Sequence, residues 1–221
     1  MKFEKIHNKG QARLFDNRIL EMLTKTHPLV IWAMYIPIIS YLFYLSMDKG
    51  GLNFWRAALT FGSGVFFWTF FEYIMHRFAF HFISEDKGTQ RFIYVMHGNH
   101  HEYPRDKERL FMPPLPSLMI SSTLLAIFYG IGYLLDMPFY ALPFFGGFIF
   151  GYLLYGSMHY AIHAWKPPFK FMKPLWRNHH LHHYKDEGKG YGVSTTIWDR
   201  VFGTMFDVSD RNAAAGKEER A

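Results

Sequence analysis

The sequence predicts an all-α integral membrane protein with four transmembrane helices in two hairpins and a cytoplasmic, histidine-rich helical cap. Three observations predict it. Long uncharged apolar runs have the length of a membrane span, the charges gather between these runs, and most of the 13 histidines lie close to the ends of the runs. Half of the 221 residues are apolar, so the mean hydropathy near zero averages a lipid-facing population with a water-facing one.

The four expected spans are mostly apolar, and each is long enough to cross the roughly 30 Å hydrocarbon core of a bilayer. The second span carries Arg56 at one end and Glu72 at the other. Arg56 can extend its charged end to the interface. Short polar turns join the first span to the second and the third to the fourth, which makes two hairpins. The spans are expected at residues 29–46, 54–75, 115–135 and 139–158.

Four spans place both termini on one side of the membrane. Of the 24 lysines and arginines, all but Lys49 and Arg56 fall on that side. Positive residues remain in the cytoplasm, so the termini and the histidines are expected to be cytoplasmic. The net charge of +6 alone would also suit a nucleic-acid-binding protein, but the spans favour a membrane protein, and no nucleic-acid partner is expected.

Three regions follow from this pattern. Residues 1–28 form an N-terminal amphipathic, cytoplasmic segment with a short surface helix expected over residues 11–26. Residues 29–206 form the membrane-embedded domain. Residues 207–221 form a polar C-terminal tail.

Eleven of the histidines fall into four tight groups. The first two groups come after the second span, and the last two come at the end of the fourth span and after it. A pair is followed in each half of the chain by a triplet that starts sixteen residues after the pair ends. The patterned residues are His76 and His81; His97, His100 and His101; His159 and His163; His179, His182 and His183.

Helical geometry brings most of these side chains to common faces, because residues three and four apart are neighbours on a helix. One turn rises about 5.4 Å, so one triplet could serve two metal ions. His76 and His81 are an exception, since residues five apart point about 140° apart on a regular helix. Either the helix ends between them or they bind different metals, and we favour a helix that ends near the membrane surface.

Burying ten imidazoles without a metal would leave many polar atoms unpaired, so the pattern predicts metal binding. The chain has no cysteine, which restricts the ligands to nitrogen and oxygen. Imidazole suits iron, zinc, copper and nickel, and ten ligands fit two ions. His7 and His27 lie outside the pattern and are expected to be structural. His180 has no place in its triplet, and its role stays open.

The histidine series HX4H, HGNHH, HX3H and HX2HH resembles the fatty acid hydroxylase superfamily, and within it most closely the fatty acid 2-hydroxylases, also called sphingolipid alpha-hydroxylases. The resemblance covers about residues 30–206 and includes three further blocks: HGNHHEYPRDKERLFMPP, YGSMHYAIHAW and GYGVSTTIWDRVFGT. It implies a functionally di-iron site with all ten histidines as ligands, O2 activation and hydroxylation at C2 of a long acyl chain of a fatty acid or sphingolipid. A purified sample is expected to be able to carry zinc in place of iron.

Many members of that family carry a fused cytochrome b5 domain that supplies electrons. Residues 1–28 leave no room for one, so the resemblance implies a separate donor such as cytochrome b5 or ferredoxin. Carboxylates near the ligands are expected to orient imidazoles through their free N–H groups. Glu72 leads these candidates because it is an acid within a span, and Asp199 is a second candidate that could also shape the substrate pocket.

Two other readings compete with this one. A sterol or acyl desaturase, or a carotenoid hydroxylase, would use related metal chemistry on another lipid, but the HX4H spacing and the RLFMPP block favour the 2-hydroxylases. A membrane metal transporter or metal-binding protein would need ligands along a path within the spans. Here the histidines lie at or beyond the span ends, on one side only.

Overall fold

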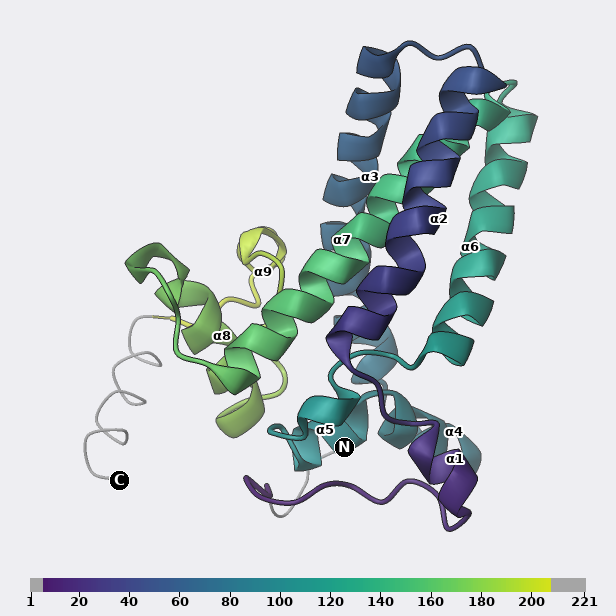
Figure 1. The fold of residues 1–221 in the computed structure, drawn as a ribbon. Helices are drawn as coiled ribbons and strands as arrows, with labels where there is room; N and C mark the ends of the chain where they lie inside the picture. The colour runs from purple at the N-terminus through teal and green to yellow at the C-terminus, as the bar shows by residue number, and fades with distance from the viewer. Residues whose placement is uncertain (1–5, 208–221) are drawn as a thin grey trace. The chain divides into compact units, whose positions relative to one another are not determined.

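The computed structural model describes residues 6–207, and within that stretch the chain forms helices, turns and loops but no strand (Figure 1). The all-α prediction is therefore confirmed for the described chain. Most of the predicted polar tail, residues 208–221, lies outside the described residues, as do residues 1–5.

Four long helices correspond to the four expected spans within a few residues. Three of them begin at a proline in the first turn, where the missing N–H costs nothing. The fourth long helix continues past the expected end of its span and so carries His159 and His163 within its last turns. The long helices are α2 (Pro28–Asp48), α3 (Phe54–Ile74), α6 (Pro114–Leu134) and α7 (Pro138–Ala164).

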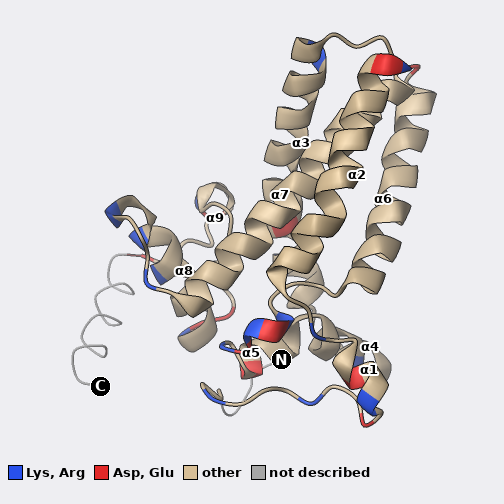
Figure 2. Ribbon diagram, in the orientation of Figure 1, with Lys and Arg blue, Asp and Glu red and all other residues tan. Residues whose placement is uncertain are grey.

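Three segments are long and apolar enough to cross a membrane by length and composition: α2, Lys107–Leu134, which includes α6, and α7. Figure 2 shows how few charged residues interrupt these helices. The helix α3 is not among the three segments, because Arg56, Glu72 and several small polar residues lower its hydropathy. The chain is thus an integral membrane protein with three clearly apolar helices.

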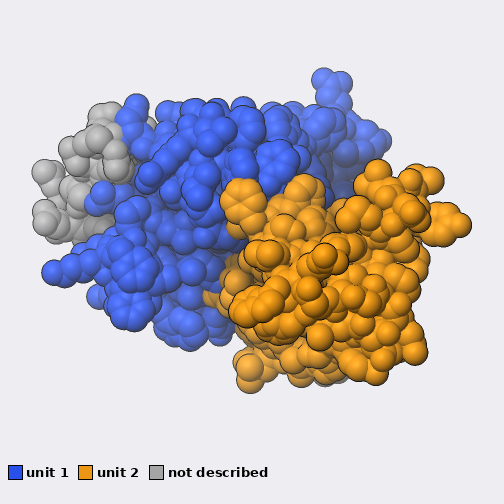
Figure 3. All heavy atoms as spheres, turned by 90° about the horizontal axis from the view of Figure 1, so that it is seen from above, with its two compact units in different colours: residues 1–14, 70–107, 158–221 blue, residues 15–69, 108–157 orange. Residues whose placement is uncertain are grey.

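The chain divides into two compact units, which Figure 3 colours separately. The boundary falls within α3 and within α7. One unit comprises residues 15–69 and 108–157 and contains most of the long helices. Within it, α7 is the most enclosed helix, since 61% of its most apolar window is buried, and its glycines allow close packing of α3, as at Gly147 against Phe61.

The other unit comprises residues 1–14, 70–107 and 158–221, and its described part consists of the last turns of α3 and α7 together with short helices and loops. It contains all ten patterned histidines. Its short helical elements are η1 (Met75–Phe80), α4 (Lys87–Ile93), η2 (Tyr94–Gly98), α5 (Asn99–Glu102), η4 (Lys170–Met172), α8 (Lys173–Tyr184) and α9 (Ile197–Val201).

The N-terminal surface helix is shorter than predicted. Only α1 (Arg18–Met22) is helical, instead of residues 11–26. The Asn17 side chain accepts hydrogen bonds from the backbone of Ile19 and Leu20 and so starts the helix at residue 18. Upstream, Leu14 is buried in non-helical chain, which explains why its apolar side chain does not mark a helical face.

Candidate metal centre

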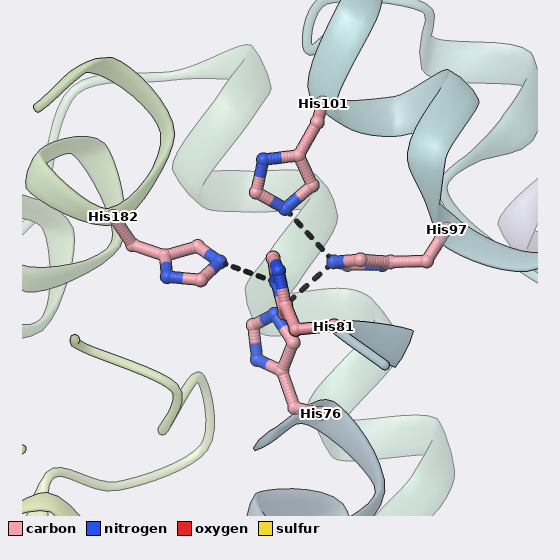
Figure 4. A group of neighbouring side chains, drawn as sticks. All are labelled: His76, His81, His97, His101 and His182. Carbon is pink, nitrogen blue, oxygen red and sulfur yellow. Dashed lines mark hydrogen bonds between the residues drawn. The ribbon is translucent and has the colours of Figure 1, made fainter. Parts of the chain in front are cut away.

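Five histidines from three parts of the chain point their rings toward a common centre (Figure 4). His76 comes from η1 and His81 from the residue that follows it, His97 from η2, His101 from α5, and His182 from α8. One ligand nitrogen from each residue lies within 4.8 Å of all the others. We refer to these five residues as the first group.

The five-residue spacing of His76 and His81 is accommodated by a π-helix. The regular helix α3 ends at Ile74, and the wider turns of η1 begin at Met75. A π-helix bonds each residue to the fifth along the chain, which brings residues five apart to the same side. The helix therefore widens just before the pair and ends at Phe80, between its two members as expected, and both histidines join the same group.

A second group of five has the same form. His159 and His163 come from the last turns of α7, and His100 comes from α5. His179 and His183 lie one turn apart on α8. Their ligand nitrogens also lie within 4.8 Å of one another, so each triplet contributes to both groups, as its helical spacing predicted.

The spacing of the Nε2 atoms fits metal binding. Imidazole nitrogens bind zinc at about 2.1 Å, so two of them that bind the same ion lie at most about 4.2 Å apart. In the first group, the Nε2 atom of His97 lies 3.1 Å from that of His76 and 2.9 Å from that of His101. The other close Nε2 pairs are His81–His182 at 3.1 Å, His100–His159 at 2.8 Å, His163–His179 at 2.9 Å and His179–His183 at 3.1 Å.

Burial keeps these imidazoles neutral, as metal ligands must be. The pKa of His76 is lowered to about 4, chiefly because the ring is buried. Burial first, and neighbouring imidazoles second, lower the pKa of the other grouped histidines outside the candidate spans. These are His81, His97, His100, His101, His179, His182 and His183.

Two backbone carbonyls hold the outer nitrogens of two first-group rings. His76 Nδ1 donates to the Tyr191 carbonyl at 2.5 Å, and His182 Nδ1 donates to the Lys189 carbonyl at 2.7 Å. A carbonyl only accepts, so the proton must lie on Nδ1, which leaves the Nε2 lone pair free for a metal. Sequence reasoning did not identify residues 189–194 as part of the site, although the block GYGVS was a signal.

Glu72 and Asp199 bind this same loop instead of bonding to an imidazole. Glu72 Oε1 accepts from the backbone N–H groups of Val193 at 2.6 Å and Ser194 at 3.0 Å. Asp199 accepts from the N–H groups of Tyr191 and Gly192, both at 2.9 Å. Burial raises the pKa of Asp199, although its hydrogen bonds oppose the shift. Both acids thus lie one step further from the histidines than expected.

A small opening reaches the first group from outside. It is lined by His81, His97 and His101 together with apolar residues and Glu187. Glu187 Oε2 lies 3.9 Å from His81 Nδ1, so a carboxylate stands at the opening beside the outermost ligand candidate.

The remaining histidines belong to neither group. His27 caps α2, where its Nδ1 accepts from the Leu29 N–H at 3.2 Å. His7 stacks on Tyr103, with ring centroids 5.0 Å apart. His180 is partly exposed on α8, and its ring centroid lies 6.2 Å from that of His163.

Comparisons with known proteins identify the family of this chain. The model of the family "Fatty acid hydroxylase" matches residues 61–204. A dihydroceramide fatty acyl 2-hydroxylase of Arabidopsis thaliana is 35% identical over 193 residues, which are 87% of this chain and 79% of that protein. A ceramide very long chain fatty acid hydroxylase of Saccharomyces cerevisiae is 38% identical over 201 residues, which are 90% of this chain but only 50% of that protein.

A solved structure has the same fold. It is that of full-length Scs7p, in which only the hydroxylase domain is visible, and it matches with a TM-score of 0.79 and 39% sequence identity. The match covers 90% of this chain and 74% of the solved one. The match to the family model, the sequence relatives and the shared fold lead to one conclusion: this chain belongs to the fatty acid hydroxylase family.

Proposed function

We propose that this chain is a membrane-embedded, O2-dependent hydroxylase that acts at C2 of a long acyl chain carried by a fatty acid or a sphingolipid. The observation that carries the proposal is the convergence of ten largely buried histidines into two groups of five. The relatives support the reaction and the lipid class, because their names describe fatty acyl and ceramide hydroxylases.

The ten histidines are the proposed ligands of two metals, one for each group. Iron is the metal expected to be active, and zinc is expected to be able to replace it in a purified sample. When bound, the metals would activate O2, which is the chemistry needed to oxidise an unactivated C–H bond. The protein's part is to hold neutral imidazoles in place and to limit the access of water. The burial of His179 and His182, both fully inaccessible to solvent, supports that role.

The proposed membrane arrangement rests on the distribution of charged residues and on the lengths of the helices. Residues 29–206 form the hydroxylase domain, preceded by the segment 1–28. We take α3 as a fourth span, because it has 21 residues, as α2 has, and because Arg56 and Glu72 lie near its ends. Four spans in two hairpins then carry the histidine cap on the cytoplasmic side, where the positive-inside rule puts the lysines and arginines.

The partners follow from the reaction. The acyl chain would enter from the lipid, since the protein lies in the membrane. Hydroxylation with O2 consumes two electrons from outside the substrate. A separate donor such as cytochrome b5 or ferredoxin is therefore part of the proposal.

The test is to produce the protein in a host that lacks 2-hydroxy lipids and to profile total lipids by mass spectrometry. His100→Ala removes a histidine of the second group and should abolish the product. His180→Ala changes a histidine on α8 that lies in neither group and should retain it. Metal content is measured on the same purified samples, with the electron donor co-produced.

A 2-hydroxylated acyl species that appears with the intact protein and with His180→Ala, but not with His100→Ala, would support the proposal and identify the lipid class. A new double bond in place of a hydroxyl group would reassign the chain as a desaturase. A folded protein without bound metal would overturn the dimetal assignment.

A further inference from the structure

The loop Lys189–Ser194, here called the anchor loop, bonds to ring nitrogens of the first histidine group. Its two carbonyls at Lys189 and Tyr191 accept from His182 and His76, respectively. These two histidines come from elements far apart in the sequence, α8 and η1. One loop therefore sets the ring orientation and the tautomer of two of the five proposed ligands.

The anchor loop is itself held by two buried carboxylates. Asp199 accepts from the N–H groups of Tyr191 and Gly192, and Glu72 accepts from those of Val193 and Ser194. Four successive backbone N–H groups thus bond to the carboxyl oxygens of two side chains. The two acids approach from different elements, α3 and α9.

Asp199 is in turn fixed from its other sides. Thr204 Oγ1 donates to Asp199 Oδ1 at 2.8 Å, and Asn178 Nδ2 donates to Oδ2 at 3.2 Å. Asp199 has no solvent exposure, and Glu72 is 5% exposed. Such acids cannot exchange their protein partners for water, so the position of the loop depends on them.

The second histidine group differs from the first in the hydrogen bonding of its Nδ1 atoms. The Nδ1 atoms of His179 and His183 are buried, and neither has a hydrogen-bond partner among the described residues. Nothing comparable to the anchor loop therefore fixes these two rings, although their Nε2 atoms converge as closely as those of the first group.

We infer that Glu72 and Asp199 are positioning residues that raise the metal affinity of the first group through the anchor loop, so the two metal positions are inequivalent. The inference rests on the proposed dimetal function and goes beyond it by assigning these acids to one metal. Loss of an outer hydrogen-bonding partner typically lowers metal affinity 10- to 100-fold. We expect that change at one metal only.

The experiment is a chelator titration of the zinc-loaded full-length protein in lipid nanodiscs, with bound zinc counted after each step. In Glu72→Met, which removes the acceptor oxygen, and in Asp199→Asn, one ion should leave at about 10- to 100-fold lower chelator concentration, while the other leaves as in the unchanged protein. Thr204→Val removes a single bond to Asp199 and should shift the same ion less. Asp106→Asn is the matched control, because Asp106 is also buried but accepts from Gln11.

Two ligand variants assign the ion that is lost early. His183→Ala leaves only the first group complete, and in that background Glu72→Met should weaken binding of the ion that remains. His182→Ala leaves only the second group complete, and there Glu72→Met should change zinc binding little. Equal shifts of both ions, a shift in the second group alone, or no shift in either acid variant would overturn the inference. If the unchanged protein bound no metal, the proposed function itself would fail, and that result is distinguishable from the others.

Discussion

His100 and His182 occupy equivalent places in their triplets, and each joins the histidine group of the opposite half of the chain. His100 Nε2 lies 2.8 Å from that of His159, and His182 Nε2 lies 3.1 Å from that of His81. Each residue of an α-helix turns about 100° from the last. In the triplet on α8, His179 and His183 therefore point about 40° apart, whereas His182 points about 60° to the other side.

Because His100 and His182 each belong to the group of the opposite half of the chain, the structure predicts which pairs of substitutions remove one metal and which remove two. His76→Ala combined with His182→Ala damages only the first group and should leave about one metal per chain. His76→Ala combined with His100→Ala damages both groups, although these two residues lie in the same half of the sequence, and should leave almost none. Metal analysis of the purified double variants measures this directly.

The matched comparison is His159→Ala combined with His100→Ala, which again affects one group only. If metal loss instead followed the halves of the sequence, so that the pair His76 and His100 removed a single ion, the assignment of the histidines to the two groups would be wrong.

The long helices and the histidine set were predictable from the sequence, because both depend on local patterns. An apolar run of span length predicts a long helix, and α6 lies within one residue of its expected bounds. The triplets at helical spacing predicted that one triplet serves both groups. Two features were not predictable in the same way. The wider winding at His76 is a departure from regular helix geometry, and the anchor loop is positioned by contacts distant in sequence, such as Glu72 with Val193.

Acid pH should destabilise the metal-free protein. Burial lowers the pKa of His76 from its ordinary 6.5 to about 4, so between these two values the unfolded chain binds a proton that the folded chain does not. Stability is then fully present above about pH 6.5 and falls as the pH drops toward 4. Burial also lowers the pKa of the other histidines of both groups outside the candidate spans, so their contribution to stability falls on acidification in the same way. Denaturation of metal-free protein between pH 7.5 and 5 should show a steady decrease, and a stability that rose on acidification would contradict it.

Metal removal should lower stability at neutral pH as well. A ligand that binds only the folded state stabilises it by about 2.7 kcal/mol when its concentration is 100 times its Kd. Stripping the protein with a strong chelator should therefore lower the midpoint of thermal unfolding, and zinc should restore it. The His180→Ala variant should behave like the unchanged protein, whereas His179→Ala should respond less to zinc.

The packing of α3 against α7 gives a prediction that is independent of the metals. A Cβ added at Gly64 would lie 2.0 Å from the Phe144 carbonyl oxygen, and one added at Gly147 would lie 1.9 Å from that of Phe61. Backbone atoms cannot rotate away as side chains do, so Gly64→Ala and Gly147→Ala must push the two helices apart. Overpacking of this kind costs about 1–3 kcal/mol of stability. Denaturant titration of the detergent-solubilised protein should show this decrease in the free energy of unfolding.

Gly62 provides the control on the same helix. A Cβ added there meets nothing within 4 Å, and alanine favours the helix over glycine by up to about 1 kcal/mol. Gly62→Ala should therefore leave stability unchanged or raise it slightly, while Gly64→Ala lowers it. Because the two substitutions are chemically identical and only two residues apart, a difference between them can come only from the close approach of α7. Equal effects at both positions would show that this contact does not limit the packing of the two helices.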